Sequence, residues 1–385
     1  MTRSPLSDLP SGARILVLRL RSIGDIVLLT PALRLLKEWR PDLRVSVLIE
    51  SRFRHLLEGN PGVEEILHPG EGAGWKKLAS RFAAVRELRQ RKFALSIDLH
   101  GGPTSRFLTR FSGARRRIGF QHFRTPSLYD ILVPDARRIL GQPTIHTAEH
   151  QASAFFYLGL PRQEIPRARL FVSAGCAAWW HEKRTSLGIT PVHAYAVIHP
   201  TALYETKQWA PEKFAQLGRY LERETGWAPV YCCGPGEAAE LDAIEQAAGA
   251  PIRRLEGTSL GQLAAALAGA SLFVGNDSGP AHMAAALARP LVVIFGSSSS
   301  PTWGPWPRPA PAGETPGPPS GARRAQEGPP ALVVQNFYDC NPCPGDRCYR
   351  FARPECILSI TFEQVRAAVE AVLAQSPQPR HPKST

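Results

Sequence analysis

Short apolar runs alternate along the chain with longer stretches in which apolar residues recur every three or four positions. Runs of the first kind have the length of buried strands, and stretches of the second kind have the period of helices. Strands separated by helices predict βαβ units and a mainly parallel sheet. In the first 160 residues the expected strands are 14–20, 44–50 and 93–99, and the expected helices are 25–40, 75–91 and 146–158. Pro31 lies in the first helix, where it predicts a kink or a later start.

The same alternation restarts near residue 194, so a second unit of the same kind is expected. Its strands are expected at 194–200, 228–233, 271–275 and 291–296, and its helices at 211–224, 236–248, 259–269 and 280–288. A chain of 385 residues is too long for one ordinary core. We therefore predict two α/β domains, 1–175 and 190–360, the second interrupted by a Pro/Gly-rich flexible loop at 297–330. A helix at 361–374 and a disordered tail at 375–385 complete the prediction.

The composition narrows the class of protein. With 43% hydrophobic and 21% charged residues the chain is typical of globular proteins. It carries 46 Lys and Arg against 33 Asp and Glu, a net charge of +13, which favours anionic partners but also fits a generally basic surface. No signal peptide is visible, and no apolar run reaches the roughly 18 residues of a membrane span. Seven unevenly placed cysteines argue against a secreted disulfide framework, so we expect a cytoplasmic protein.

Residues 271–288, SLFVGNDSGPAHMAAALA, place a cluster of special residues between a strand and a helix. Ligands of parallel sheets bind beyond the carboxyl ends of the strands, and the first turn of a helix offers free amides to a phosphate. Gly279 permits close approach of a ligand, and Pro280 suits the first helical position, which needs no N–H. Ser278 and His282 add donors, and Asp277 can accept from sugar hydroxyls. An ordinary capped turn is the alternative interpretation.

Four segments together resemble glycosyltransferase family 9, the ADP-heptose:lipopolysaccharide heptosyltransferases. They are ILVLRLRSIGDIVLLTPALRLLK near the start, IHPTALYETKQW after residue 197, GNDSGPAH, and CNPCPGDRCYRFARPECI near the end. The resemblance covers nearly the whole chain. It implies a GT-B fold, in which two Rossmann-like parallel-sheet domains face each other across a cleft. It also implies inverting transfer of heptose from ADP-heptose to the Kdo/heptose–lipid A inner core.

The resemblance assigns roles to two ionisable residues. Asp25 would be the base that takes the proton from the acceptor hydroxyl, with a role as helix N-cap as the alternative. Lys207 would stabilise the charge that develops on the departing nucleoside diphosphate. Thr201 and Thr206 compete for a phosphate contact, because the segment between Thr201 and Lys207 departs from the family pattern.

The segment YCCGPGEAA keeps a second activity open. Gly234, Gly236 and Ala239 match the dinucleotide fingerprint, with Glu256 about 20 residues on, as in a nicotinamide-dependent oxidoreductase. Against this, the match is not in the first βαβ unit of its domain. In the GT-B interpretation the same loop contacts the nucleoside, with Gly234 in the loop and Glu237 as a candidate for a ribose or adenine contact. A member of the same family that uses another sugar or acceptor is a further alternative.

Arginines that follow the segment DLHGGPTS suit an anionic glycolipid acceptor, since Arg binds phosphate and carboxylate bidentately. We assign acceptor contacts to Arg106 and Arg117, and expect peripheral contact with the inner membrane surface. No nucleic acid partner is expected, because no aromatic-interleaved RNA or DNA motif is present. We expect the protein to be a monomer.

Four cysteines near the end of the chain follow the pattern C-x2-C-x4-C-x7-C. Four thiolates can bind zinc or an iron–sulfur cluster, but the usual zinc pattern has two C-x2-C pairs and only one is present. We therefore predict structural thiols and no metal or other cofactor, with metal binding as the alternative. The cysteines are Cys340, Cys343, Cys348 and Cys356.

Overall fold

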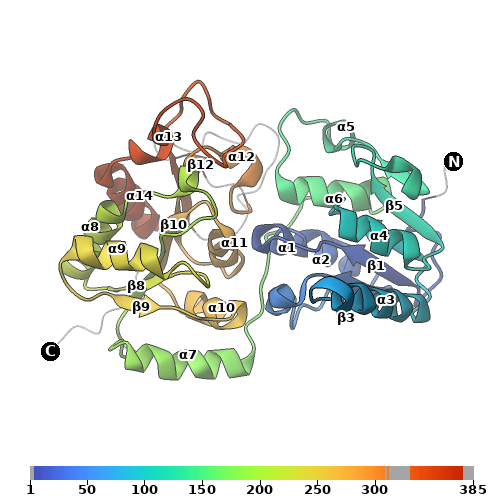
Figure 1. Cartoon of the computed structure of the whole chain (residues 1–385), viewed down its shortest axis with the longest axis horizontal. Helices are drawn as coiled ribbons and strands as arrows, with labels where there is room; N and C mark the ends of the chain where they lie inside the picture. The colour runs from blue at the N-terminus through green and yellow to red at the C-terminus, as the bar shows by residue number, and fades with distance from the viewer. Residues whose placement is uncertain (1–3, 308–309, 312–329, 376–385) are drawn as a thin grey trace. The chain divides into compact units, whose positions relative to one another are not determined.

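The computed structural model describes residues 4–307, 310–311 and 330–375. The chain divides into two compact units, Met1–Phe171 and Val172–Thr385 (Figure 1). Each unit is a parallel sheet covered by helices, so the predicted α/β class is confirmed. Most of the expected flexible loop at 297–330, and nearly all of the expected tail at 375–385, lie outside the described residues.

The first unit is built on six parallel strands in the order β3-β2-β1-β4-β5-β6. After β1 the chain adds β2 and β3 on one side and then returns to add the other three on the opposite side. The order therefore reverses between β1 and β4, and in open α/β sheets ligands bind at the carboxyl ends of such a strand pair. The strands are β1 (Arg14–Leu18), β2 (Arg44–Leu48), β3 (Glu65–Leu67), β4 (Leu95–Asp98), β5 (Arg116–Phe120) and β6 (Ile131–Val133).

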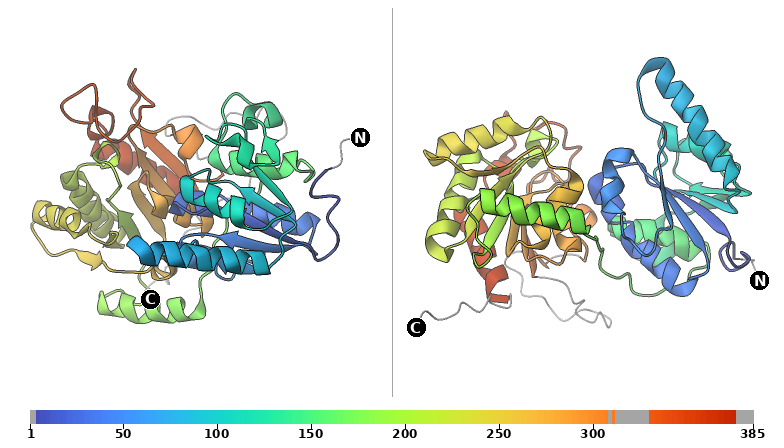
Figure 2. Two further views of the ribbon diagram at one scale, coloured as in Figure 1. Left: turned by 45° about the vertical axis from the view of Figure 1, so that its right-hand side comes forward. Right: turned by 90° about the horizontal axis from the view of Figure 1, so that it is seen from below.

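Helices cover both faces of this sheet (Figure 2). They are α1 (Ile23–Val27), α2 (Thr30–Trp39), α3 (Gly74–Gln90), α4 (Pro103–Phe111), α5 (Ala136–Leu140) and α6 (Thr147–Tyr157). Helices α2, α5 and α6 pack together on one face, and α3 and α4 pack on the other. The second face is sealed by a core that includes Leu16, Leu18, Leu88, Phe93 and Leu108.

The helix expected at 25–40 is two helices, with the later start that Pro31 predicts for the second of them. Helix α1 ends at Val27, and α2 begins at Thr30 with Pro31 in its first turn. Proline lacks the N–H that a continuous helix would need at that position, so the chain starts a new helix there. Asp25 is consequently not an N-cap. It is the third residue of α1, and Ser22 is the cap.

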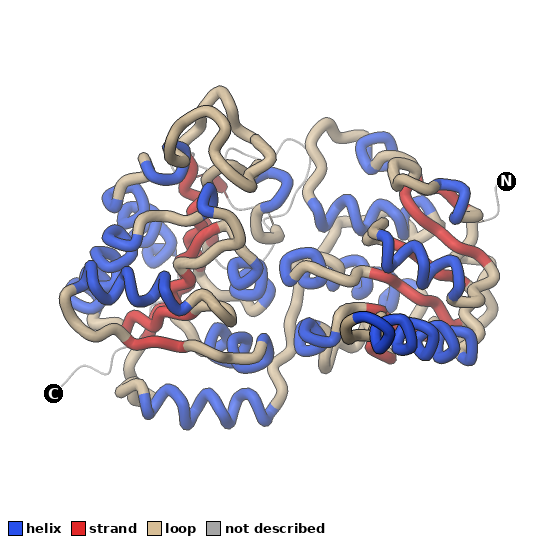
Figure 3. Tube along the Cα trace, viewed as in Figure 1, coloured by secondary structure: helices blue, strands red, loops and turns tan. Residues whose placement is uncertain are grey.

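The second unit has seven parallel strands in the order β12-β13-β11-β10-β7-β8-β9 (red in Figure 3). After β7 the chain adds β8 and β9 on one side and then β10, β11 and β13 on the other. The order reverses between β7 and β10. The strands are β7 (Tyr195–His199), β8 (Ala228–Cys232), β9 (Arg253–Leu255), β10 (Leu272–Asn276), β11 (Leu291–Phe295), β12 (Ala310–Pro311) and β13 (Ala331–Gln335).

Helices α8, α9 and α14 pack on one face of the second sheet, and α7, α10 and α11 on the other. The span that the prediction left between its two domains forms α7, whose Trp180 donates to Tyr195 on β7 at 2.9 Å. The helix expected at 211–224 ends at Tyr220 and continues as one π turn, Leu221–Thr225. The helices are α7 (Ala174–Ser186), α8 (Pro211–Tyr220), α9 (Ala238–Ala248), α10 (Leu260–Ala268), α11 (Gly279–Ala286), α12 (Ser300–Trp303), α13 (Glu355–Leu358) and α14 (Phe362–Gln375). Across the part of the chain that the structure describes, no helix has both the length and the apolar character to cross a bilayer.

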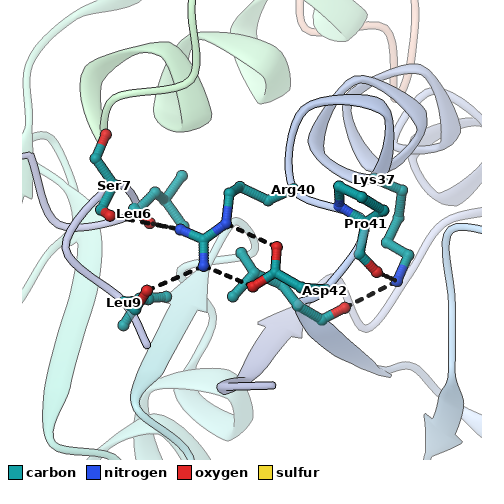
Figure 4. A network of polar contacts seen from close by, with 8 residues as sticks. Leu6, Ser7, Leu9, Lys37, Arg40, Pro41 and Asp42 are labelled. Carbon is teal, nitrogen blue, oxygen red and sulfur yellow. Dashed lines mark hydrogen bonds and ion pairs between the residues drawn. The ribbon is translucent and has the colours of Figure 1, made fainter. Parts of the chain in front are cut away.

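Arg40 ties the start of the chain to the turn between α2 and β2 (Figure 4). Its guanidinium donates to the carbonyl oxygens of Leu6 and Leu9 at 2.9 and 3.0 Å. It also pairs with both carboxylate oxygens of Asp42, at 2.8 and 2.7 Å. The hydrogen bond from Arg40 lowers the pKa of Asp42 to about 2, so this pair stays ionised throughout the neutral range. The pair lies where β2 begins, at the edge of the sheet opposite to the carboxyl ends of its strands.

Candidate functional site

In the second unit, the loops after β7, β8 and β10 meet at the point where strand order reverses. Asn276 at the end of β10 joins the loops, because its amide donates to the carbonyl of Pro200 at 2.6 Å and its Oδ1 accepts from the Trp209 N–H at 3.2 Å. The strands approach closely here. A Cβ on Gly275 would lie 2.7 Å from the backbone oxygen of His199, so only glycine fits between β10 and β7.

The central feature of this site is an ion pair between Lys207 and Asp277. Lys207 Nζ lies 2.7 Å from Asp277 Oδ2, although the two residues are 70 positions apart in the chain. The Lys207 side chain is 23% exposed and that of Asp277 is 7% exposed. Asp277 therefore fixes the position of an ammonium group that solvent and a ligand can still reach.

Packing on β11 holds the loop that carries Lys207. Thr206, the residue before it, is buried, and its hydroxyl donates to the carbonyl of Gly345. A Cβ on Gly296, just after β11, would collide with the backbone oxygen of Thr206. Thr206 is thus a structural anchor of the loop, which leaves Thr201 as the candidate that faces the other loops of the site.

Thr201 and the loop after β8 share one carboxylate. Glu237 Oε2 accepts from the Thr201 hydroxyl at 2.5 Å and from the Gly234 N–H at 2.8 Å. A Cβ on Gly234 would lie 2.9 Å from the same oxygen, so the glycine permits this bond. Glu237, the candidate for a ribose or adenine contact, thus lies where the loops after β7 and β8 meet.

His199 connects Thr201 with the start of α11. Its Nε2 lies 3.3 Å from the Thr201 hydroxyl and its Nδ1 lies 3.2 Å from the Ser278 hydroxyl. Burial lowers the pKa of His199 to about 4, so the imidazole is neutral at pH 7. Because Thr201 donates its one proton to Glu237, it must accept from His199, which assigns the ring proton to Nε2.

Helix α11 begins at Gly279, one residue earlier than expected, with Ser278 as its N-cap and Pro280 in second place. The N–H of Gly279 has no acceptor within its own helix, since the first N–H groups of any helix are unpaired there. The rest of α11 is buried, His282 included. The positive end of the helix dipole therefore lies at the switch point, the place between β7 and β10 where the strand order reverses. The loop that carries Lys207 lies beside it.

In the first unit, Asp25 lies at the corresponding position, beyond the carboxyl ends of β1 and β4. Its Oδ2 accepts from the Ser22 N–H and hydroxyl at 3.0 and 3.1 Å, and its Oδ1 pairs with Arg19. Arg19 also donates to the carbonyl of Leu99, which joins the loops after the two strands. The Asp25 side chain is 18% exposed. The guanidinium and Ser22 thus hold the carboxylate in place, and part of it stays open to solvent.

Two imidazoles lie in the electrostatic neighbourhood of Asp25. Burial lowers the pKa of His100, and it lowers the pKa of His150 to about 4, so both are neutral at pH 7. The His100 loop is held by the buried carboxylate of Asp98, which accepts from the N–H groups of His100 and Gly101 at 2.8 and 2.9 Å. Asp25 therefore lies among neutral imidazoles, the cation of Arg19 and the buried carboxylate of Asp98.

Comparison with known proteins identifies the family. The sequence profile of glycosyltransferase family 9 (heptosyltransferase) matches residues 81–312. The chain belongs to glycosyltransferase family 9. It is 29% identical over 300 residues to lipopolysaccharide heptosyltransferase 3 of Escherichia coli (strain K12), an alignment that covers 74% of this chain and 83% of that protein.

Solved structures agree on the fold. The glycosyl transferase family 9 structure from Veillonella parvula DSM 2008 superposes with a TM-score of 0.78 at 21% identity, covering 95% of this chain and 98% of that one. E. coli heptosyltransferase WaaC with ADP gives a TM-score of 0.66 at 21% identity, covering 93% and 99%. The predicted GT-B fold is confirmed, and the protein is a glycosyltransferase of the heptosyltransferase type. Asp25 lies before the segment that the family profile matches, so its role depends on its own geometry.

The contacts of the GPGEAA segment agree with a glycosyltransferase loop and do not require a nicotinamide cofactor to explain them. Its loop follows β8, the second strand of its unit, and its Glu237 is bonded to Thr201. Glu256, the acidic residue of the fingerprint, is paired with Arg254. The family assignment therefore sets aside the oxidoreductase alternative.

The four cysteines near the C-terminal end of the chain lie beside the loop that carries Lys207. All four thiols line one pocket of about 50 Å³ together with Thr206 and Ser297. Burial, with a smaller contribution from the neighbouring thiols, raises the pKa of Cys356 to about 11, so it is a thiol at neutral pH. Within the described residues, no three His, Cys, Asp or Glu side chains are arranged to hold a metal ion. The absence of a metal cofactor stays a prediction.

The two predicted acceptor arginines have different surroundings. Arg106 lies on α4, just after the His100 loop, and donates to the Thr125 hydroxyl at 2.5 Å. Arg117 lies near the start of β5 and is paired with both oxygens of Asp130, at 2.7 and 3.0 Å. The structure thus brings Arg106, and not Arg117, to the end of the sheet that carries Asp25.

Sequence reasoning missed the residues that organise the two sites. They are Arg19, Asp98, His100, His150, His199 and Asn276. Three of them, Asp98, His199 and Asn276, are the last residues of strands β4, β7 and β10, and Arg19 and His100 follow a strand within two positions. A search for polar residues at the ends of predicted strands would have found these five. His150 sits within α6 and carries no such signal.

Proposed function

We propose that this protein transfers heptose from ADP-heptose, with inversion, to an anionic inner-core acceptor of lipopolysaccharide, a Kdo or heptose–lipid A glycolipid. The observation that carries the proposal is that each switch point holds the ionisable group that the chemistry needs. The first unit supplies the carboxylate of Asp25, and the second supplies Lys207 beside the start of α11. The names of the curated relatives support the sugar and the acceptor, and the WaaC structure with ADP supports the nucleotide.

On this proposal Asp25 acts as general base. Its ionised carboxylate accepts the proton of the acceptor hydroxyl while that oxygen attacks the anomeric carbon of the donor. Arg19 pairs with Oδ1 of this carboxylate and the Ser22 N–H donates to Oδ2, so the orientation of the group is fixed. The neighbouring imidazoles of His100 and His150 are neutral, so they form no ion pair with this carboxylate.

The second unit holds the leaving group. As the bond between the anomeric carbon and the diphosphate oxygen breaks, its electron pair remains on the diphosphate. Lys207 and the first-turn amides of α11 stabilise that growing charge, which is the role a divalent cation has in other enzymes. Glu237 and Thr201 lie on the neighbouring loops and suit the ribose.

A screen of nucleotide sugars tests the donor. Thermal unfolding is followed with ADP, UDP and GDP and their sugars, and with NADH for the oxidoreductase alternative. A ligand at 100 times its dissociation constant stabilises by about 2.7 kcal/mol. We expect the ADP compounds to stabilise most, and heptose transfer to require ADP-heptose. Stabilisation by UDP or GDP compounds alone would refute the donor assignment.

Gly279→Val tests the phosphate cradle. The added side chain occupies the space in which the first N–H of α11 would meet the diphosphate, so we expect ADP to bind at least about tenfold more weakly by calorimetry. Gly175→Val is the matched control, since Gly175 also lies in the first turn of a helix of this unit and an added Cβ there meets nothing within 4 Å. Equal ADP affinity of the wild type and Gly279→Val would remove α11 from the donor site.

Helix α3 supports the proposed contact with a membrane surface. Trp75, Leu78 and Phe82 lie on one side of the helix and are 86%, 42% and 59% exposed, an unusual amount of apolar surface for one helix. Lys76 and Lys77 adjoin them, and the chain carries a net charge of +13. Exposed aromatics flanked by cations are typical of helices that lie on anionic bilayers.

Vesicle sedimentation tests this contact. We expect the double variant Trp75→Ser, Phe82→Ser to bind phosphatidylglycerol vesicles at least about tenfold more weakly, because two aromatic side chains no longer enter the interface. Phe337→Ser is the control, since Phe337 is 75% exposed in the other unit. If the double variant sediments with the vesicles as the wild type does, α3 is not the membrane-facing element.

A further inference from the structure

A pocket of about 320 Å³ lies in the first unit, and none of the groups assigned above to glycosyl transfer lines it. Three segments form it: the α2 side chains from Thr30 to Glu38, the turn at 60–62, and residues 167–171 at the end of the unit. The walls are tied together, because Thr30 Oγ1 accepts from the Arg169 N–H at 3.1 Å and donates to Val27 O at 2.7 Å.

The pocket is strongly basic. Four cations line it, Arg34, Lys37, Arg167 and Arg169, against the single carboxylate of Glu38. Glu38 is already bonded to Arg34 at 2.6 Å. Lys37 donates to the carbonyls of Pro41 and Leu43 at 2.8 and 2.9 Å (Figure 4), and its third N–H has no acceptor among the described residues. In the portion of the chain that the structure describes, no carboxylate pairs with the Arg169 guanidinium. An anion in the pocket would pair with Arg169 and Lys37.

The buried side-chain amide of Asn60 distinguishes this pocket from an ordinary basic surface. Asn60 is 8% exposed and lines the pocket. Its Oδ1 accepts from the Gly62 N–H at 2.8 Å, so the oxygen is engaged and the amide nitrogen is the group left for the pocket. Over the described ranges, 4–307, 310–311 and 330–375, that nitrogen donates to no protein acceptor. The side chain is buried as a whole, so a nitrogen with no protein acceptor is placed to donate to a ligand in the pocket.

We propose that this pocket binds a phosphate monoester carried on a saccharide. The cations and the Asn60 amide would hold the phosphate, and the half-exposed ring of Phe171 would pack against the sugar. The volume is at the lower end of the range for ligand pockets, which suits one sugar ring with its phosphate. The same chemistry can come from a free sugar phosphate or from a phosphorylated lipid headgroup. The site is separate from the proposed transfer chemistry and does not depend on it.

Asn60→Asp is the sharpest test. The new carboxylate still accepts from the Gly62 N–H, so the turn is kept, but the donor becomes a negative oxygen. Calorimetry with glucose 6-phosphate should give saturable binding to the full-length wild type, at least about tenfold weaker binding to Asn60→Asp and Arg169→Gln, and none with glucose. Arg138→Gln, which changes an exposed arginine of the same unit, should bind as the wild type does.

Vesicles that contain phosphatidic acid distinguish the source of the phosphate. If they bind in a manner sensitive to Asn60→Asp while glucose 6-phosphate does not bind, the ligand is a lipid headgroup and the phosphate-monoester site stands. If only glucose 6-phosphate responds, the ligand is a free sugar phosphate. If neither probe binds, or if both bind to Asn60→Asp and Arg169→Gln as to the wild type, the pocket is not a phosphate site. The unfolding midpoint of each variant, compared with the wild type, shows that the fold is retained.

Discussion

Turnover of the Asp25→Asn enzyme should fall by about 100-fold to 10,000-fold, while its affinity for ADP-heptose stays near that of the wild type. The amide oxygen can still accept from the Ser22 N–H, so the first turn of α1 is kept. The group that takes the proton from the acceptor is lost, and donor binding does not need it. Steady-state transfer and calorimetry on the same preparation measure the two effects.

Asp42→Asn is the matched control for this experiment. It removes a carboxylate that is likewise paired with an arginine of the first unit, at the opposite edge of the same sheet. We expect it to leave the turnover number unchanged. Wild-type turnover of Asp25→Asn would leave the residue only a structural role, the bond to the Ser22 N–H in the first turn of α1. Equal losses in both variants would trace the effect to a broken ion pair and not to base catalysis.

Replacing Lys207 with Met should lower turnover by about 100-fold to 1,000-fold, because the growing charge on the diphosphate loses its ammonium partner. It should also lower stability by up to about 3 kcal/mol, since the variant leaves the buried carboxylate of Asp277 without its cation. Urea unfolding and single-turnover transfer measure the two losses separately.

A double variant separates the structural role of Lys207 from its chemical role. Lys207→Met combined with Asp277→Asn removes the unpaired charge, so we expect much of the stability to return while turnover stays low. Lys213→Met, a lysine of α8 that donates to the carbonyls of Leu358 and Ile360, should leave the turnover of the folded enzyme unchanged. Recovery of turnover together with stability in the double variant would show that Lys207 acts only through the fold.

The predictable parts of this protein are those encoded by neighbouring residues. Apolar runs such as 14–18, 195–199 and 291–295 are strands because a parallel sheet buries both of its faces, and the helices between them follow from their 3.6-residue period. The same local reasoning placed Asp277, Ser278 and Gly279 between a strand and a helix. It located the break at Pro31 without fixing the bounds of the two helices, and it failed at short strands such as Glu65–Leu67, which carry too little pattern to detect.

What only the tertiary structure decided is which loops meet. Lys207 lies beside Asp277 because the chain places β10 next to β7 and not next to β9, a choice that depends on how whole βαβ units pack. Arg19 reaches Leu99 for the same reason, through the pairing of β1 with β4. Periodicity along a chain reports whether a side chain is buried, but not which distant segment covers it. The sequence by itself therefore determined two α/β units and the residue types of the site, and the order of strands in each sheet determined the site itself.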